Sequence, residues 1–104
     1  MKKEISVQEL HKIVGTVALV DVREPDEYIS GHVPTAVLMP LATVPVRMNE
    51  LDRSQTLYMV CQAGGRSAQA CAFLEQQGYD VVNVVGGTGQ WIGAGFDTNT
   101  GEQP

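Results

Sequence analysis

Apolar and polar positions follow two different rhythms along the chain, and these rhythms predict where strands and helices lie. Short, nearly continuous apolar runs indicate strands that are covered on both faces, as in a parallel sheet. Between them, apolar residues recur at the three- and four-residue spacing of one helix face. The pattern predicts strands at 4–5, 17–22, 36–39, 56–60 and 81–85, and helices at 7–14, 24–30, 46–51, 67–77 and 88–92.

Local signals mark the beginnings of several of these helices. Ser6 with Glu9 three residues later forms a capping-box pattern. Pro25 is followed by two acids, which suits a first helical turn. Thr88 is expected to be the N-cap of the last helix. Because strand and helix alternate about five times, we expect an α/β fold with a mostly parallel sheet and helices on both faces.

Length and charge narrow the possible classes of protein. The 104 residues fit one domain, which we place at 1–97, followed by a polar, mobile tail at 98–104. The formal net charge of -5 argues against nucleic acid and acidic membrane surfaces as partners. The sequence shows neither an apolar run of transmembrane length nor a signal peptide, so we expect a cytoplasmic setting. Nothing in the sequence suggests an obligate assembly, so we expect a monomer.

The stretch 61–67, Cys-Gln-Ala-Gly-Gly-Arg-Ser, carries the most distinctive chemistry. Cys61 ends a predicted strand, a two-glycine loop follows, and a helix begins. The first amides of a helix lack intrahelical partners and carry partial positive charge, and glycines let a loop turn its N–H groups inward. These amides and the charge of Arg66 favour the thiolate over the thiol. We therefore expect a nucleophilic thiolate that faces an anion-binding loop.

Cys61 is accordingly predicted to be the catalytic residue. The competing interpretation is a small buried hydrophobic residue, which is the usual role of a cysteine at the end of an apolar strand. Cys71 lies well inside the next helix and is expected in the core, and the two cysteines give neither a disulfide framework nor a zinc spacing. We expect no metal and no organic cofactor. The residues predicted to bind the substrate are Gln62, Ala63, Gly64, Gly65, Arg66 and Ser67.

Other polar residues in apolar surroundings have structural explanations. Asp21 interrupts an apolar run and is expected to accept hydrogen bonds from nearby loop amides or to cap the following turn. Arg23 is expected to pair with Glu24 or Glu27, and His32 to pack and hydrogen-bond within its turn. The sequence leaves open which further arginines reach the pocket: Arg23, Arg47 or Arg53.

Three stretches together resemble the single-domain rhodanese-like sulfurtransferases. The active loop of that family has a Cys, four residues, an Arg and then Ser or Thr, as residues 61–67 have here. The other two stretches are DVREPDEYISGHVP at 21–34 and GGTGQW at 86–91, in the family's order along the chain. The family commonly carries a glycine where Thr35 stands in this chain.

The resemblance implies a five-stranded, mostly parallel sheet, with the active loop at the carboxyl end of a strand. It also implies a persulfide relay, in which the Cys61 thiolate takes the outer sulfur of a small anionic donor such as thiosulfate. The sulfur then passes to cyanide, to a thiol or to a protein cysteine. The family's reaction uses no cofactor.

The sequence also fits other functions that occur on the same fold. Phosphatases and arsenate reductases resemble this loop but place five residues between the Cys and the Arg, where this chain has four. A non-catalytic interaction module is a further alternative, although such modules tend to lose the cysteine. A sulfur carrier that serves one protein acceptor would leave the same signature, so the physiological donor and acceptor are not defined.

Overall fold

The strands form one parallel sheet, as the sequence predicts. A computed structural model describes residues 3–104. The order across the sheet is β1-β5-β4-β2-β3, and every neighbouring pair is parallel. The strands are β1 Glu4–Ile5, β2 Ala18–Asp21, β3 Val37–Leu38, β4 Thr56–Val60 and β5 Asp80–Val84. The α/β fold with five strands is therefore confirmed.

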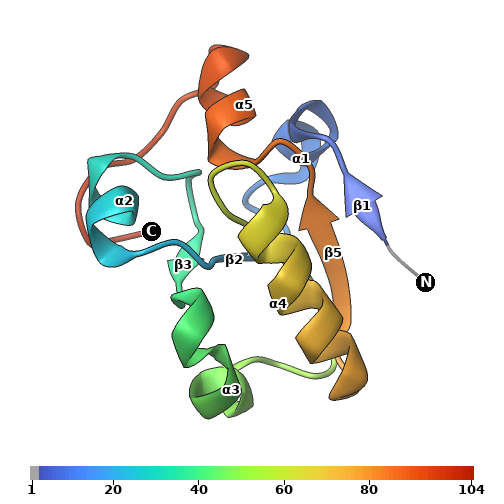
Figure 1. Ribbon diagram of the computed structural model, residues 1–104. Coiled ribbons are helices and arrows are strands. Elements are labelled where there is room, and N and C mark those ends of the chain that lie inside the picture. The colour runs from blue at the N-terminus through green and yellow to red at the C-terminus, as the bar shows by residue number, and fades with distance from the viewer. Residues whose placement is uncertain (1–2) are drawn as a thin grey trace.

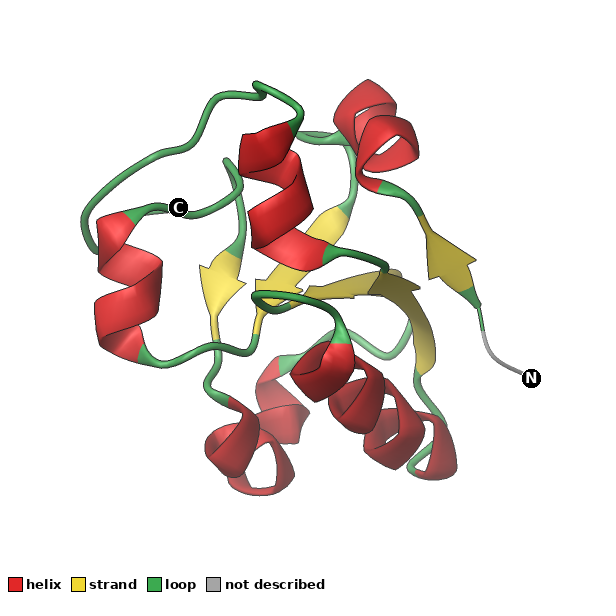
Figure 2. Ribbon diagram, turned by 45° about the horizontal axis from the view of Figure 1, so that its top comes forward, coloured by secondary structure: helices red, strands yellow, loops and turns green. Residues whose placement is uncertain are grey.

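Helices cover both faces of this sheet (Figure 1, Figure 2). They are α1 Val7–Ile13, α2 Pro25–Ser30, α3 Val44–Arg47, α4 Gly65–Gln76 and α5 Gly87–Gly93, and short 3₁₀ turns, η1 and η2, cover Leu41–Thr43 and Met48–Glu50. Buried side chains of α1, α2 and α5 pack together on one face, and those of α3 and α4 pack on the other. The molecule thus has a helix–sheet–helix arrangement with a hydrophobic cluster on each side of the sheet.

Strand β4 lies in the middle of the sheet and contributes to both clusters. Met59 joins the cluster beneath α4, where it packs with Leu74, while Val60 joins the opposite cluster with Trp91. All four of these side chains are at most 1 % exposed. Burying one such side chain contributes about 1.5–3 kcal/mol. The residue that follows Val60 is therefore held by an anchored strand.

The predicted ends of elements needed small corrections. The capping box of Ser6 and Glu9 is confirmed. Helix α4 begins at Gly65, two residues earlier than the sequence predicts, because the loop before it is short. The N-cap of α5 is Gly86, so the prediction for Thr88 was wrong. The Thr88 hydroxyl is instead buried, with no hydrogen-bond partner among the described residues.

The last residues, for which the sequence predicts a mobile tail, are hydrogen-bonded to the region of α2. The backbones of His32 and Asn99 exchange two hydrogen bonds of 2.9 Å, and the Gly101 amide donates to the Ile29 carbonyl at 2.9 Å. His32 packs within its turn as predicted: its ring stacks on Tyr28 at 3.7 Å, and Nδ1 lies 2.8 Å from the Tyr28 carbonyl oxygen. The C-terminus consequently ends beside α2 (Figure 1).

Thr35 has an unusual backbone conformation. Its φ is 75°, the only positive value at a residue other than glycine in the described part of the chain. A β-branched residue is strained in this region. Thr35, which stands where the family that the sequence resembles commonly has a glycine, therefore keeps a glycine-like backbone conformation.

Candidate active site

Cys61 lies at the carboxyl end of β4, at the start of the loop that leads into α4. Only 1 % of the residue is exposed, and it contacts the cluster beneath α4. Its sulfur nevertheless has a polar partner, because the Gly64 amide donates to Sγ at 3.0 Å. Gly64 has a φ of 109°, in the left-handed region that favours glycine, and this conformation turns the loop back over the sulfur. The site is thus unlike the ordinary environment of a buried cysteine.

A second donor to the sulfur comes from the first turns of α4. The Ser67 hydroxyl lies 3.3 Å from Cys61 Sγ and 2.5 Å from Asn83 Oδ1. Asn83 Nδ2 also donates to the Gly64 carbonyl at 3.3 Å. Asn83 therefore supports both groups that contact the sulfur. Sequence reasoning missed this residue, although its signal was the same as that of Asp21, an isolated polar side chain within an apolar strand.

These contacts change the acidity of the thiol. Burial is the largest single influence on the pKa of Cys61, and it favours the neutral form. Hydrogen bonds from the Ser67 hydroxyl and from the Ser67, Gly64 and Ala63 amides together outweigh burial, so the pKa lies below its ordinary value. The hydrogen bonds of the loop thus favour the thiolate, in the direction that the sequence predicts, and the charge of Arg66 is not among the causes of this shift.

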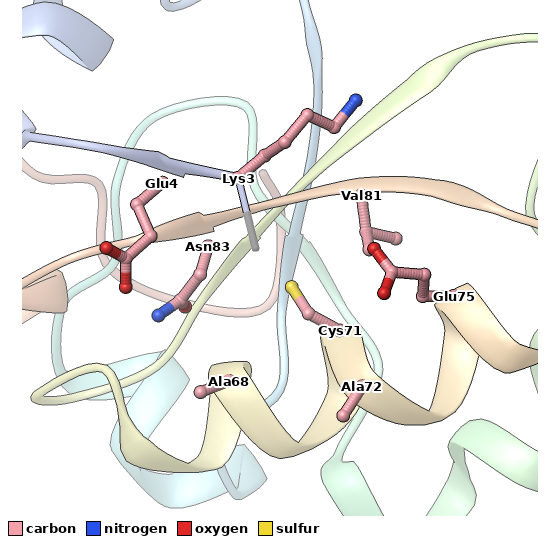
Figure 3. A pocket seen from close by; sticks show the side chains of 8 residues that line it. All are labelled: Lys3, Glu4, Ala68, Cys71, Ala72, Glu75, Val81 and Asn83. Carbon is pink, nitrogen blue, oxygen red and sulfur yellow. The ribbon is translucent and has the colours of Figure 1, made fainter. Parts of the chain in front are cut away.

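The second cysteine has the opposite character. Burial, followed by the negative charges of Glu75 and Cys61, raises the pKa of Cys71 to about 12. Cys71 packs against the cluster beneath α4, as predicted, but is only partly buried. It faces a cavity of about 350 Å³ between α4 and strands β1 and β5 (Figure 3), whose lining does not include Cys61. At neutral pH Cys71 is thus a protonated thiol outside the loop.

Arg66 does not point at the sulfur in this structure. Its two terminal nitrogens donate to the two carboxylate oxygens of Glu27, at 2.7 and 2.9 Å. The side chains are 35 % and 31 % exposed, so the pair lies at the rim of the fold. Hydrogen bonds from Arg66 lower the pKa of Glu27 to about 2, and Glu27 in turn raises that of Arg66. The role of Arg66 in binding a donor remains a prediction.

Arg23 also has a different partner from those expected. It pairs with Asp21 rather than with Glu24 or Glu27, with an Nη2–Oδ2 distance of 2.9 Å, and both side chains are at most 3 % exposed. Asp21 accepts the backbone amide of Arg23 as well, as predicted for loop amides. Arg23 Nη1 further donates to Gln62 Oε1 at 3.2 Å, so this arginine reaches the loop.

The other two arginines in question have partners elsewhere. Arg47 pairs with Glu50, three residues along the chain. Arg53 donates to the Gln77 carbonyl at 2.6 Å and lies over the Tyr79 ring. These partners all lie outside the loop.

The first turn of α5 hydrogen-bonds to the start of the loop. The Thr88 amide donates to the Cys61 carbonyl at 2.8 Å, and the Gly89 amide donates to the Gln62 carbonyl at 3.0 Å. A Cβ atom on Gly87 would lie 2.3 Å from the Cys61 carbonyl oxygen, closer than any real contact. Glycine at this position therefore lets the two loops approach each other.

Comparisons with known proteins assign the chain to a family. A model described as a rhodanese-like domain matches residues 6–94. The chain belongs to the rhodanese-like domain family. It is 42 % identical over 81 residues to a sulfurtransferase of Allochromatium vinosum, which covers 77 % of this chain and 76 % of that protein. It is 36 % identical over 94 residues to a putative sulfurtransferase of Bacillus subtilis, covering 88 % and 91 %.

A solved structure agrees with the fold of this rhodanese-like domain. The crystal structure of a rhodanese-related protein from Thermoplasma volcanium superposes with a TM-score of 0.89 at 31 % identity. The match covers 93 % of this chain and 97 % of that one.

The rhodanese-like domain brings together only part of the predicted site. Gly64 and Ser67 contact the sulfur directly, and Gly65 begins α4. The side chains of Gln62 and Arg66 are each held by a partner outside the loop. Within residues 3–104, no group of three His, Cys, Asp or Glu side chains is placed to hold a metal, and no helix is long and apolar enough to cross a bilayer.

Proposed function

We propose that this rhodanese-like domain is a sulfurtransferase that carries a sulfane sulfur as a persulfide on Cys61. The observation that carries the proposal is the pair of donors at Cys61 Sγ, the Gly64 amide at 3.0 Å and the Ser67 hydroxyl at 3.3 Å. Two relatives named as a sulfurtransferase and a putative sulfurtransferase support the reaction class.

In the first half-reaction, the Cys61 thiolate attacks the outer sulfur of a donor such as thiosulfate. The S–S bond of thiosulfate breaks as the bond to Sγ forms, and sulfite leaves with the electron pair. Cys61 then carries one extra sulfur with a negative charge. We expect the loop amides and the N-terminal end of α4, which begins at Gly65, to stabilise that charge.

In the second half-reaction, cyanide, a thiol or a protein cysteine attacks the outer sulfur and regenerates the Cys61 thiolate. Only Cys61 makes and breaks covalent bonds in this cycle. Because Cys61 is 1 % exposed, we expect the loop residues above the sulfur to shift when a donor or acceptor approaches. Small donors suit such restricted access.

The setting of this reaction is also a proposal. We place the domain in the cytoplasm as a monomer, where thiols remain reduced. A net charge of -5 supports small molecules or protein cysteines as partners, in preference to nucleic acid or an acidic membrane surface.

The test is the mass of the intact protein after the reduced form has been incubated with thiosulfate. We expect a gain of one sulfur atom that cyanide removes, that Cys61→Ser abolishes and that Cys71→Ser leaves in place. Failure to gain sulfur, or a gain that survives Cys61→Ser, would overturn the proposal. Turnover of a phosphoester without sulfur loading would instead support the phosphatase alternative.

A further inference from the structure

Both arginines at the loop have their charge compensated by a carboxylate. Arg66 belongs to the loop and is paired with Glu27. Arg23 reaches the loop through Gln62 and is paired with Asp21. A donor that approaches Cys61 therefore meets backbone amides and neutralised side chains at these positions, rather than an unpaired cation.

Glu27 is held firmly in its position. It lies in the first turn of α2, where its Oε1 also accepts the Glu24 amide at 3.1 Å in a capping box. The same carboxylate accepts both terminal nitrogens of Arg66. Arg66 can hold the oxygens of a donor only by giving up this bidentate pair, which is a strong arrangement for arginine.

The cost of breaking the pair depends on the charge of the donor. Thiosulfate brings two negative charges next to the Cys61 thiolate and next to Glu27. An aliphatic hydropersulfide, R–S–SH, brings at most one charge at its reacting end and has no oxyanion that needs Arg66. Like charges at short range oppose binding, so the dianion loses more than the hydropersulfide.

We propose that Glu27 is a specificity-determining residue that holds Arg66 and thereby favours hydropersulfide donors over thiosulfate. The inference rests on the proposed function, since it names the donor class of the same site. The Cys61 thiolate attacks the outer sulfur of R–S–SH, the donor S–S bond breaks, and R–S⁻ leaves with the electron pair. The proton stays on the transferred sulfur, so atoms and charge balance.

The matched variants are Glu27→Gln and Asp26→Asn. Glutamine keeps an oxygen for the Glu24 amide but removes the charge that holds Arg66. Asp26 is an exposed carboxylate in the same helical turn, and its replacement makes the same change in net charge. The readout is the ratio of kcat/KM for thiosulfate to kcat/KM for the hydropersulfide of N-acetylcysteamine, which has no carboxylate of its own.

In the unmodified protein we expect this ratio to be below one. Glu27→Gln should raise the ratio about fivefold, the effect of one partly exposed ion pair, and Asp26→Asn should leave it within about twofold of the original. A second substitution, Arg66→Gln, should cancel the increase in the Glu27→Gln background, because the freed guanidinium is what holds the dianion.

An unchanged ratio in Glu27→Gln, an equal rise in Asp26→Asn or a rise that persists without Arg66 would overturn the specificity role. In each of these cases sulfur loading of Cys61 would still support the proposed function. Failure of Cys61 to accept sulfur from either donor would instead overturn the function and the inference together.

Discussion

Replacing Ser67 with alanine should make the Cys61 thiol less reactive at neutral pH. The Ser67 hydroxyl is fully buried and lies 3.3 Å from Cys61 Sγ and 2.5 Å from Asn83 Oδ1. A hydroxyl has one proton and can donate it to one of these acceptors at a time. Because a thiolate accepts more strongly than a neutral amide, we expect the proton to turn toward Sγ when Cys61 ionises and toward Asn83 when it does not.

The size of the effect is the difference between these two hydrogen bonds. A hydrogen bond to a charged group contributes about 1.5–3 kcal/mol and one between neutral groups about 0.5–1.5 kcal/mol. Ionisation of Cys61 therefore gains about 1 kcal/mol from Ser67, taken at the lower end because the contact with Sγ is long. Without the hydroxyl, the thiolate fraction well below the pKa should fall about fivefold.

The assay is the rate of alkylation by iodoacetamide, followed by mass across a range of pH. The rate of Ser67→Ala should be about fivefold lower on the acidic side of the curve and should converge with the unmodified protein once Cys61 is fully ionised. Cys71 does not obscure the measurement, because its pKa is raised to about 12.

Ser54→Ala is the matched control. The Ser54 hydroxyl is exposed and bonds Asp52 at 2.6 Å, in the turn before β4 and therefore at the opposite end of that strand from Cys61. Its loss should leave the curve in place. Identical curves for Ser67→Ala and the unmodified protein would refute the assigned hydrogen bond, and so would an equal drop in Ser54→Ala.

Three further predictions concern stability, measured by urea unfolding. Glu27→Gln should lower the free energy of unfolding by about 1 kcal/mol at pH 7, the value of a partly exposed ion pair. The pKa of Glu27 is about 2 in the folded protein against 4.5 for a free glutamate, so the difference between variant and unmodified protein should vanish as the pH falls through about 2. A difference that stays constant with pH would contradict this prediction. Asp21→Asn should cost about 3 kcal/mol or more, because Arg23 stays buried without its counter-charge, and a loss below about 1 kcal/mol would count against this. Gly87→Ala should lower the free energy of unfolding by about 3 kcal/mol, because its Cβ would collide with the Cys61 carbonyl oxygen. Gly93→Ala is the control: its Cβ meets nothing within 4 Å, so its stability should stay within about 0.5 kcal/mol of the unmodified protein. Similar losses in both variants would disprove the close approach at Gly87.

The sequence was sufficient for the features that depend on neighbouring residues. Apolar runs and capping patterns predicted the order of strands and helices, because these signals act within one or two turns of chain. The same reasoning placed Cys61 at the end of β4 and identified the glycine-rich loop, and the structure confirms a Gly64 amide at 3.0 Å from the sulfur. The loop conformation is thus a local property of glycine and of a helix start.

The sequence was not sufficient for the partners of the arginines. Arg66 and Glu27 are 39 residues apart, and only the packing of α2 beside the loop brings them together. Arg23 was expected to pair with Glu24 or Glu27, but the fully buried Asp21 needs a counter-charge more than those less buried acids do. Charge pairing follows desolvation in the folded protein, which local spacing does not reveal.

The second glycine stretch shows how one loop depends on another. From the sequence, residues 86–91 were explained as a turn that starts a helix. In the structure, the Thr88 and Gly89 amides donate to the Cys61 and Gln62 carbonyls, so this turn uses its free helix-start amides to hold the start of the loop at Cys61. Residues 61 and 62 are thereby held in place at the start of the loop whose Gly64 amide donates to the sulfur. The position of the candidate nucleophile therefore depends on both glycine stretches, and a Cβ atom added at Gly87 would collide with the Cys61 carbonyl oxygen, 2.3 Å away.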